Sequence, residues 1–174
     1  MDIDARLLEA AERLFDGEGF NATGMGRLVR ESGLSSRTVY KHAGSKNALM
    51  AKVLSERQRR FFAHLDAEST TALFASLRSW VEQEGARGCL FFRVHAETGG
   101  GMPEIEAVVS AYHTELHGLI AALVARETGA ADAVLADRVL ALFEGATTAA
   151  TYRGTAVIDA ASAGAAQLVA AAAS

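Results

Sequence analysis

Residues 25–42, MGRLVRESGLSSRTVYKH, are the stretch that decides the fold. Leu28, Leu34 and Val39 are apolar at the positions where two short helices would pack together, and Gly33 stands at the turn between them. Glycine suits such a turn because it readily adopts the left-handed conformation that ends a helix. The pattern predicts a helix-turn-helix whose second helix could meet base edges and phosphates in the major groove of DNA. The polar side chains of that helix are Ser35, Ser36, Arg37, Thr38, Tyr40, Lys41 and His42.

Helical spacing of apolar residues extends to both sides of this motif. Upstream, apolar residues recur every three or four positions over about residues 4–17. Downstream, Ser45 can cap a helix over about 46–65, and further apolar stripes follow, the last two over about 131–152 and 156–173. A single proline among 174 residues also favours helices, because proline disrupts helix interiors. We therefore predict an all-α chain.

Charge is distributed unevenly along the chain. The net charge is −4, which by itself argues weakly against nucleic acid as a partner. Residues 21–60, however, hold nine Lys and Arg against two Asp and Glu, whereas residues 61–174 hold six against thirteen. A basic module on an acidic body would let one face meet a polyanion such as DNA. Chance clustering of charge on a solvated surface is the alternative that this count leaves open.

The N-terminus and the cysteine content bear on localisation. Residues 1–11 are acidic and amphipathic, without the basic start and apolar core of a signal peptide. We find no run of about 20 apolar residues of the kind that predicts a membrane-spanning helix. Cys89 is the sole cysteine, so no internal disulfide can form, which suits a reducing compartment. We expect a cytoplasmic protein with no membrane partner.

Residues 11–54, AERLFDGEGFNATGMGRLVRESGLSSRTVYKHAGSKNALMAKVL, closely resemble the N-terminal domain of TetR/AcrR transcriptional regulators. The resemblance includes the LF…GF.AT entry, the ESGLS turn, the TVYKH recognition helix and the SKNAL start of the next helix. It extends more loosely over the rest of the chain, including RGCLFF at 87–92 and LFEGA at 142–146. By this resemblance the protein is expected to be a transcriptional regulator.

The resemblance also implies an architecture of about nine helices and a mode of action. A helix-turn-helix DNA-binding domain would occupy residues 1–46, and a ligand-binding and dimerisation domain residues 47–174. A linking helix over 46–65 would join them. Members of the family are usually homodimers that release double-stranded operator DNA when a small molecule binds. We therefore expect a homodimeric repressor with a small apolar or aromatic effector.

The DNA contacts implied by the resemblance lie in the helix-turn-helix and at the start of the linking helix. Thr23, a plausible N-cap of the first helix of the motif, would offer its hydroxyl to a phosphate, and Lys46 would lie close to the DNA backbone. Departures from the family pattern at Gly24, Gly26, Val29 and Ala43, where phenylalanine is usual, leave the precision of docking open. The implied contacts are Thr23, Ser36, Arg37, Thr38, Tyr40, Lys41, His42 and Lys46, and the polar pattern of the recognition helix adds Ser35.

Aromatic and histidine side chains lie on the helices that surround the effector pocket in that family. Each aromatic side chain could instead belong to an ordinary core. His113 and His117, four residues apart, share a helical face and could hold a metal, but no HExxH motif accompanies them. We predict no metal and no cofactor, and we expect Cys89 to be an inert cysteine. The candidate pocket residues are Trp80, Phe91, Phe92, His95, Tyr112, His113, His117 and Phe143.

Two other classes of function compete with an effector-released regulator. An enzyme would need a catalytic motif, and the sequence has no GxSxG, Walker A, GxGxxG or CxxC, nor a suggestive pair of carboxylates, so we predict that it is not an enzyme. A constitutive DNA-binding protein without an effector would have a solid body with no cavity. Turnover assays test the first alternative, and ligand-dependent thermal shifts test the second.

Overall fold

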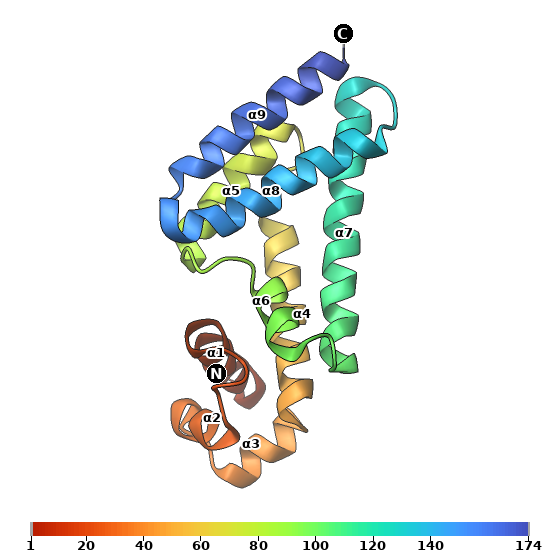
Figure 1. The fold of residues 1–174 in the computed structure, drawn as a ribbon. Coiled ribbons are helices and arrows are strands. Elements are labelled where there is room, and N and C mark those ends of the chain that lie inside the picture. The colour runs from red at the N-terminus through yellow and green to blue at the C-terminus, as the bar shows by residue number, and fades with distance from the viewer. Residues whose placement is uncertain (1, 174) are drawn as a thin grey trace. The chain divides into compact units, whose positions relative to one another are not determined.

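The computed structural model describes residues 2–173, and every regular element in this range is an α-helix (Figure 1). Nine helices lie within that range, which confirms the expected all-α chain of about nine helices. They are α1 (Ile3–Glu18), α2 (Met25–Ser32), α3 (Ser36–Ala43), α4 (Lys46–His64), α5 (Thr70–Glu84), α6 (Leu90–Thr98), α7 (Pro103–Thr128), α8 (Ala133–Arg153) and α9 (Ala156–Ala172).

Short polar residues and a glycine set the helix ends of the helix-turn-helix. The Ser35 side chain accepts a hydrogen bond from the Thr38 amide at the start of α3, and the Ser45 hydroxyl accepts one from the Ala48 amide at the start of α4. These bonds satisfy amides that have no partner within the helix. Gly33 ends α2 with a φ of 64°, the left-handed conformation expected at the turn.

Thr23 does not cap α2, so its predicted capping role was wrong. Gly24 is the residue before the helix, and it supplies no side-chain cap. The Thr23 hydroxyl instead donates a hydrogen bond to the Gly19 carbonyl at 2.8 Å. The hydroxyl therefore closes the turn between α1 and α2 and leaves the first amides of α2 without it.

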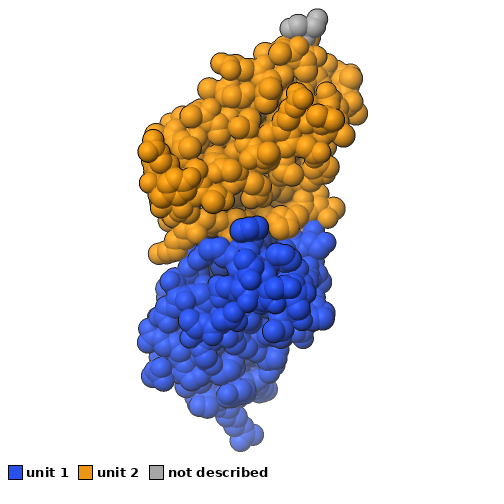
Figure 2. Space-filling model, in the orientation of Figure 1, with its two compact units in different colours: residues 1–59, 90–111 blue, residues 60–89, 112–174 orange. Residues whose placement is uncertain are grey.

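The chain divides into two compact units (Figure 2). Unit 1 comprises residues 1–59 and 90–111, and unit 2 comprises residues 60–89 and 112–174. Helices α4 and α7 each contribute residues to both units. This structural division differs from the functional division at residue 46 that the sequence suggested, and the functional division stays a prediction.

Unit 1 is built around the packing of α1, α2 and α3. Leu28 on α2 and Val39 on α3 are fully buried, as the helix-turn-helix pattern predicts. The rings of Phe15 and Phe20 lie 5.5 Å apart in the same core. Ala43, where a phenylalanine was the family expectation, is also fully buried, so a small side chain closes the end of α3.

Unit 2 is built around α5, α8 and α9, with α9 packed along both of the others. Part of α7 also belongs to it, and α7 is the one helix of the described chain whose length and composition alone would allow it to cross a membrane. Its fully buried side chains, such as Ile105, Leu116 and Ile120, form one stripe at helical spacing. Other positions of α7 are exposed, among them His113 and Glu115. Packing of this stripe inside the protein accounts for the apolar composition of α7.

Candidate functional site

The outward surface of α3 carries four polar side chains that are free to bind a ligand. Ser36, Arg37, Tyr40 and Lys41 are exposed, and Tyr40 keeps 56% of its surface accessible. Within residues 2–173, none of the four side chains makes a hydrogen bond or ion pair. Two cations, a hydroxyl and a phenol on one short helix are a set suited to base edges and phosphates.

Two other predicted contact residues of α3 are engaged with each other. The Ser35 and Thr38 hydroxyls are 2.8 Å apart, and the Ser35 hydroxyl also accepts from the Thr38 amide. Both residues therefore hold the start of α3 in place. A contact from either hydroxyl to DNA would have to share the oxygen with this cap.

His42 at the end of α3 is held from two directions. Its Nδ1 lies 2.8 Å from a carboxylate oxygen of Asp4 in α1, and its carbonyl accepts a hydrogen bond of 2.8 Å from the Lys52 ammonium in α4. The side chain is half-buried. The partnership with Asp4 spans 38 positions in the sequence, and no local pattern signals it.

Thr23 and Lys46 lie close to the α1–α2 turn, and neither is freely exposed. Thr23 is fully buried, with its hydroxyl bonded to Gly19. The Lys46 ammonium lies 4.3 Å above the centre of the Phe20 ring. Partial burial lowers the pKa of Lys46, and the nearby Glu97 carboxylate opposes this shift. Whether these two residues contact DNA stays a prediction.

An ion-pair network fixes α1 against α4 and α6 within unit 1. Arg57 on α4 is 5% exposed and donates to the Glu12 carboxylate at 2.9 Å, with the Asp16 carboxylate at 3.8 Å. Asp16, itself 5% exposed, also receives the Arg93 guanidinium from α6 on its side chain and on its carbonyl. No sequence pattern signalled this network, because the arginines on α4 and α6 are 36 to 81 positions from each other and from their carboxylate partners on α1.

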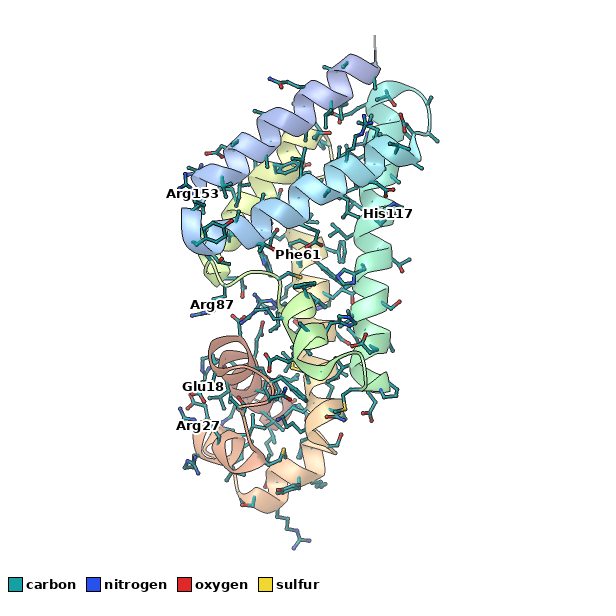
Figure 3. The ribbon with its side chains drawn as sticks, viewed as in Figure 1. Glu18, Arg27, Phe61, Arg87, His117 and Arg153 are labelled. Atoms are coloured by element: carbon teal, nitrogen blue, oxygen red, sulfur yellow. The ribbon has the colours of Figure 1, made fainter. Side chains whose placement is uncertain are left out.

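A surface ion pair links the end of α1 to α2. Arg27 donates to the Glu18 carboxylate at 2.8 Å, and Figure 3 labels both side chains. This hydrogen bond lowers the pKa of Glu18 and raises that of Arg27. Both groups are exposed, so water and salt screen the pair and it contributes little to stability. One of the basic side chains of the 21–60 segment is therefore already neutralised by an acidic partner.

Three of the predicted pocket residues, Trp80, Tyr112 and Phe143, surround one aromatic ring in unit 2. Phe61 of α4, labelled in Figure 3, lies 5.2 Å from Trp80, 5.8 Å from Tyr112 and 6.5 Å from Phe143, measured between ring centres. Phe62 adds a further ring 5.8 Å from Tyr112. Tilted and edge-on pairs at these separations are favourable. Phe61 and Phe62 were not among the predicted pocket residues, although both are apolar residues of the helix predicted over 46–65.

The remaining predicted pocket residues of unit 2 are exposed. His113 lies on the surface of α7 with its ring 5.3 Å from that of Tyr112. His117 Nε2 lies 3.2 Å from the Asp137 carboxylate of α8. In the part of the chain that the structure describes, no three side chains of metal-binding type come together.

Three predicted pocket residues lie on α6, in unit 1. Phe91 is buried, whereas Phe92 is 60% exposed. His95 is exposed, and its Nδ1 lies 2.8 Å from the Glu106 carboxylate of α7. These three side chains therefore differ in environment, and their shared place on α6 does not make them a single lining.

Glu144 on α8 follows Phe143 and stands out electrostatically. It is half-buried, and burial raises its pKa. Among the described residues, no cation or hydrogen-bond donor compensates its carboxylate.

A separate groove of about 390 Å³ between α5 and α9 is lined by other residues, including Phe74, Arg78 and Asp159. None of the eight predicted pocket residues lines that groove.

The helix-turn-helix and the chain as a whole both resemble known proteins. Residues 7–53 match the family described as bacterial regulatory proteins, tetR family. A TetR-family transcriptional regulator from Streptomyces coelicolor is 21% identical with a TM-score of 0.86, over 99% of this chain and 96% of that one. A TetR-type regulator from Streptomyces avermitilis is 25% identical with a TM-score of 0.81, over 99% and 98%.

The reduced form of NemR from E. coli shares the fold at 19% identity and a TM-score of 0.73, over 95% of each chain. No curated relative matches this chain in sequence. Residues 7–53 thus belong to a helix-turn-helix of the tetR family, and nearly the whole chain shares the fold of TetR-family transcriptional regulators.

Proposed function

We propose that this regulator is a cytoplasmic, homodimeric repressor that a small apolar or aromatic effector releases from its operator. The observation that carries the DNA-binding half of this proposal is the exposed, unpartnered set on α3: Ser36, Arg37, Tyr40 and Lys41. Such side chains can bind a base edge or a phosphate without first breaking an internal hydrogen bond or ion pair. Arg37 and Lys41 are our candidates for reading bases, since cations bind guanine O6 and N7 in the major groove.

The surfaces of α8 and α9 support a homodimer. Exposed positions recur every three or four residues on both helices, and most are small or apolar. Small side chains let helices approach closely, so two α8–α9 pairs could form a four-helix bundle about a two-fold axis. A two-fold dimer would present two copies of α3 to half-sites about one DNA turn apart. The positions of this face are Val134, Arg138, Ala141, Gly145, Thr148 and Tyr152 on α8, and Ala156, Ala160, Ala163 and Gln167 on α9, while Asp137, Arg153 and Asp159 are among the other exposed residues of the two helices.

The aromatic cluster around Phe61 supports an effector that is apolar or aromatic. Phe62 and Trp80 are only partly buried, so the cluster is accessible at these two members. Glu144, next to Phe143 in the sequence, would supply one polar group to orient a ligand that carries a donor or a positive charge. Effector sites of this kind combine an apolar lining with few polar groups.

Helix α4 is our candidate for the coupling element. It begins at Lys46 in unit 1 and reaches Phe61 in unit 2 without interruption. An effector that prefers one position of α4 would change how Lys46 and the helix-turn-helix meet DNA. A differential of about 1–3 kcal/mol changes operator affinity about 5- to 150-fold, and operator DNA must then weaken the effector by the same factor.

Selection of duplexes from a random-sequence pool by the purified protein tests the DNA-binding half. We expect a two-fold-symmetric motif whose affinity falls steeply with salt; about eight phosphate contacts per dimer give a slope of about −7 in log K against log salt. A pool that stays random at every salt concentration would refute sequence-specific binding.

A thermal-shift screen of apolar and aromatic compounds, followed by anisotropy with the selected duplex, tests the effector half. We expect compounds that stabilise the protein also to release the duplex, and to bind more weakly in its presence. Stabilising compounds with equal affinity in the presence and absence of DNA would favour the alternative of a constitutive DNA-binding protein.

A further inference from the structure

The turn between α1 and α2 is held by a residue of α6 that the DNA-binding motif does not include. The Asn21 amide donates to Glu97 Oε2 at 2.8 Å, and the Asn21 side chain donates to the Glu97 carbonyl at 2.8 Å. Gly19 in the same turn has a φ of 93°, and a Cβ there would lie 3.2 Å from Glu97 Oε1. The carboxylate therefore lies directly against a turn backbone that only glycine readily adopts.

The same carboxylate acts on the lysine that begins α4. Phe20, between Gly19 and Asn21, carries the Lys46 ammonium 4.3 Å above its ring. Lys46 makes no direct ion pair within residues 2–173, but the Glu97 charge attracts it. Ring, carboxylate and ammonium thus form one assembly of three side chains from the α1–α2 turn, α6 and α4.

We propose that Glu97 is a positioning residue for DNA binding: its charge restrains the Lys46 ammonium against Phe20, while its hydrogen bonds order the α1–α2 turn. The two effects oppose each other. The hydrogen bonds preorganise the turn, whereas the negative charge competes with a DNA phosphate for Lys46. The proposal rests on the proposed function in one respect, which is that Lys46 contacts phosphate.

Replacing Glu97 by glutamine separates the charge from the hydrogen bonds. The E97Q amide oxygen can still accept from the Asn21 amide, and the backbone carbonyl of residue 97 is unchanged. Lys46→Met removes the ammonium and keeps a long apolar side chain to pack on Phe20. Glu104→Gln is a matched control, because Glu104 is also an exposed glutamate of unit 1 and lies outside this assembly.

The experiment measures the affinity of wild type, E97Q, K46M and the double variant for the duplex selected by wild type, from low to high salt. We expect E97Q to bind about three- to tenfold more tightly at low salt and the gain to fade as salt screens the charges. We expect K46M to weaken binding and to abolish the gain from E97Q, and E104Q to show less gain than E97Q.

Equal gains from E97Q with and without Lys46 would overturn the proposal, because the carboxylate would then repel DNA directly. An affinity unchanged by K46M would overturn it as well, while sequence-specific binding by wild type would leave the proposed function standing. A readout without DNA covers the case in which no duplex is selected. An NMR titration of the Lys46 Cε resonance should show a lower pKa in E97Q than in wild type, because the carboxylate favours the ammonium. An unchanged pKa would refute the restraint itself.

Discussion

Arg57→Met removes the buried cation at the centre of the α1–α4–α6 network. The methionine retains an apolar stem that can fill the space along α4, so the substitution deletes chiefly the charge and its hydrogen bonds. Glu12 then loses the guanidinium at 2.9 Å, and the Asp16 carboxylate loses the same guanidinium at 3.8 Å. Since Arg57 and Asp16 are each 5% exposed, water cannot fully replace the lost contacts.

Breaking a buried ion pair by removing one partner costs about 3–5 kcal/mol. Two features reduce the cost here. Asp16 keeps the Arg93 guanidinium, and the Glu12 side chain is 21% exposed and can be partly hydrated. We therefore expect a loss of about 2–3 kcal/mol in the free energy of unfolding, which for a chain of this size lowers Tm by about 4–12 °C.

Thermal denaturation followed by circular dichroism, at one protein concentration, measures this difference. Arg59→Met is the matched control, because Arg59 lies two residues away on the same helix but is 68% exposed and pairs with Glu56 in the preceding turn. The control should lose about 0.5 kcal/mol or less. Equal Tm shifts for the two variants would refute the reasoning, since burial would then add nothing to the interaction.

Three further variants test other parts of the molecule. Arg37→Ala should weaken binding to the selected duplex about tenfold or more without changing protein stability, since a bidentate base contact is worth about 1–3 kcal/mol; anisotropy and thermal denaturation measure the two. Ala141→Arg, on the exposed side of α8, should give monomers in sedimentation. Ala150 is not a suitable site for this test, because it is buried and a charge there would disrupt the core of the protomer. Glu144→Gln should stabilise the protein at pH 7 and have little effect at pH 4. A raised folded-state pKa means that wild type loses stability as pH rises from the ordinary value of the carboxyl through the raised one.

Helix positions in the DNA-binding motif were predictable because their determinants are local. Ser35 and Ser45 bond to amides three residues ahead, and Gly33 has the left-handed φ that its turn requires. Helical spacing likewise identified Leu28 and Val39 as buried. Each of these features acts within one or two turns of helix, so a short window of sequence contains all the information that it needs.

Side-chain partnerships in the candidate site were not predictable in the same way. His42 and Thr23 look alike in sequence to any polar residue of a DNA-binding surface, yet one pairs with Asp4 and the other closes a turn with Gly19. The Asp4 partner is 38 positions away, and Glu97 is 76 positions from Asn21. Such contacts depend on where whole helices pack, which residue type and spacing do not encode.

The effector site raises a harder question, because an apolar stripe looks the same whether it fills a core or lines a pocket. The Phe61 ring packs against those of Trp80 and Phe143 at favourable separations, as rings in an ordinary core do. What distinguishes a binding site from a core is a polar group left uncompensated beside such rings, since an ordinary core pairs its polar groups. Glu144, which follows Phe143 on α8, is half-buried and burial raises its pKa, so substituting it tests whether a ligand uses this carboxylate. A positively charged ligand that pairs with this carboxylate should lose affinity in E144Q, whereas a purely apolar ligand should not.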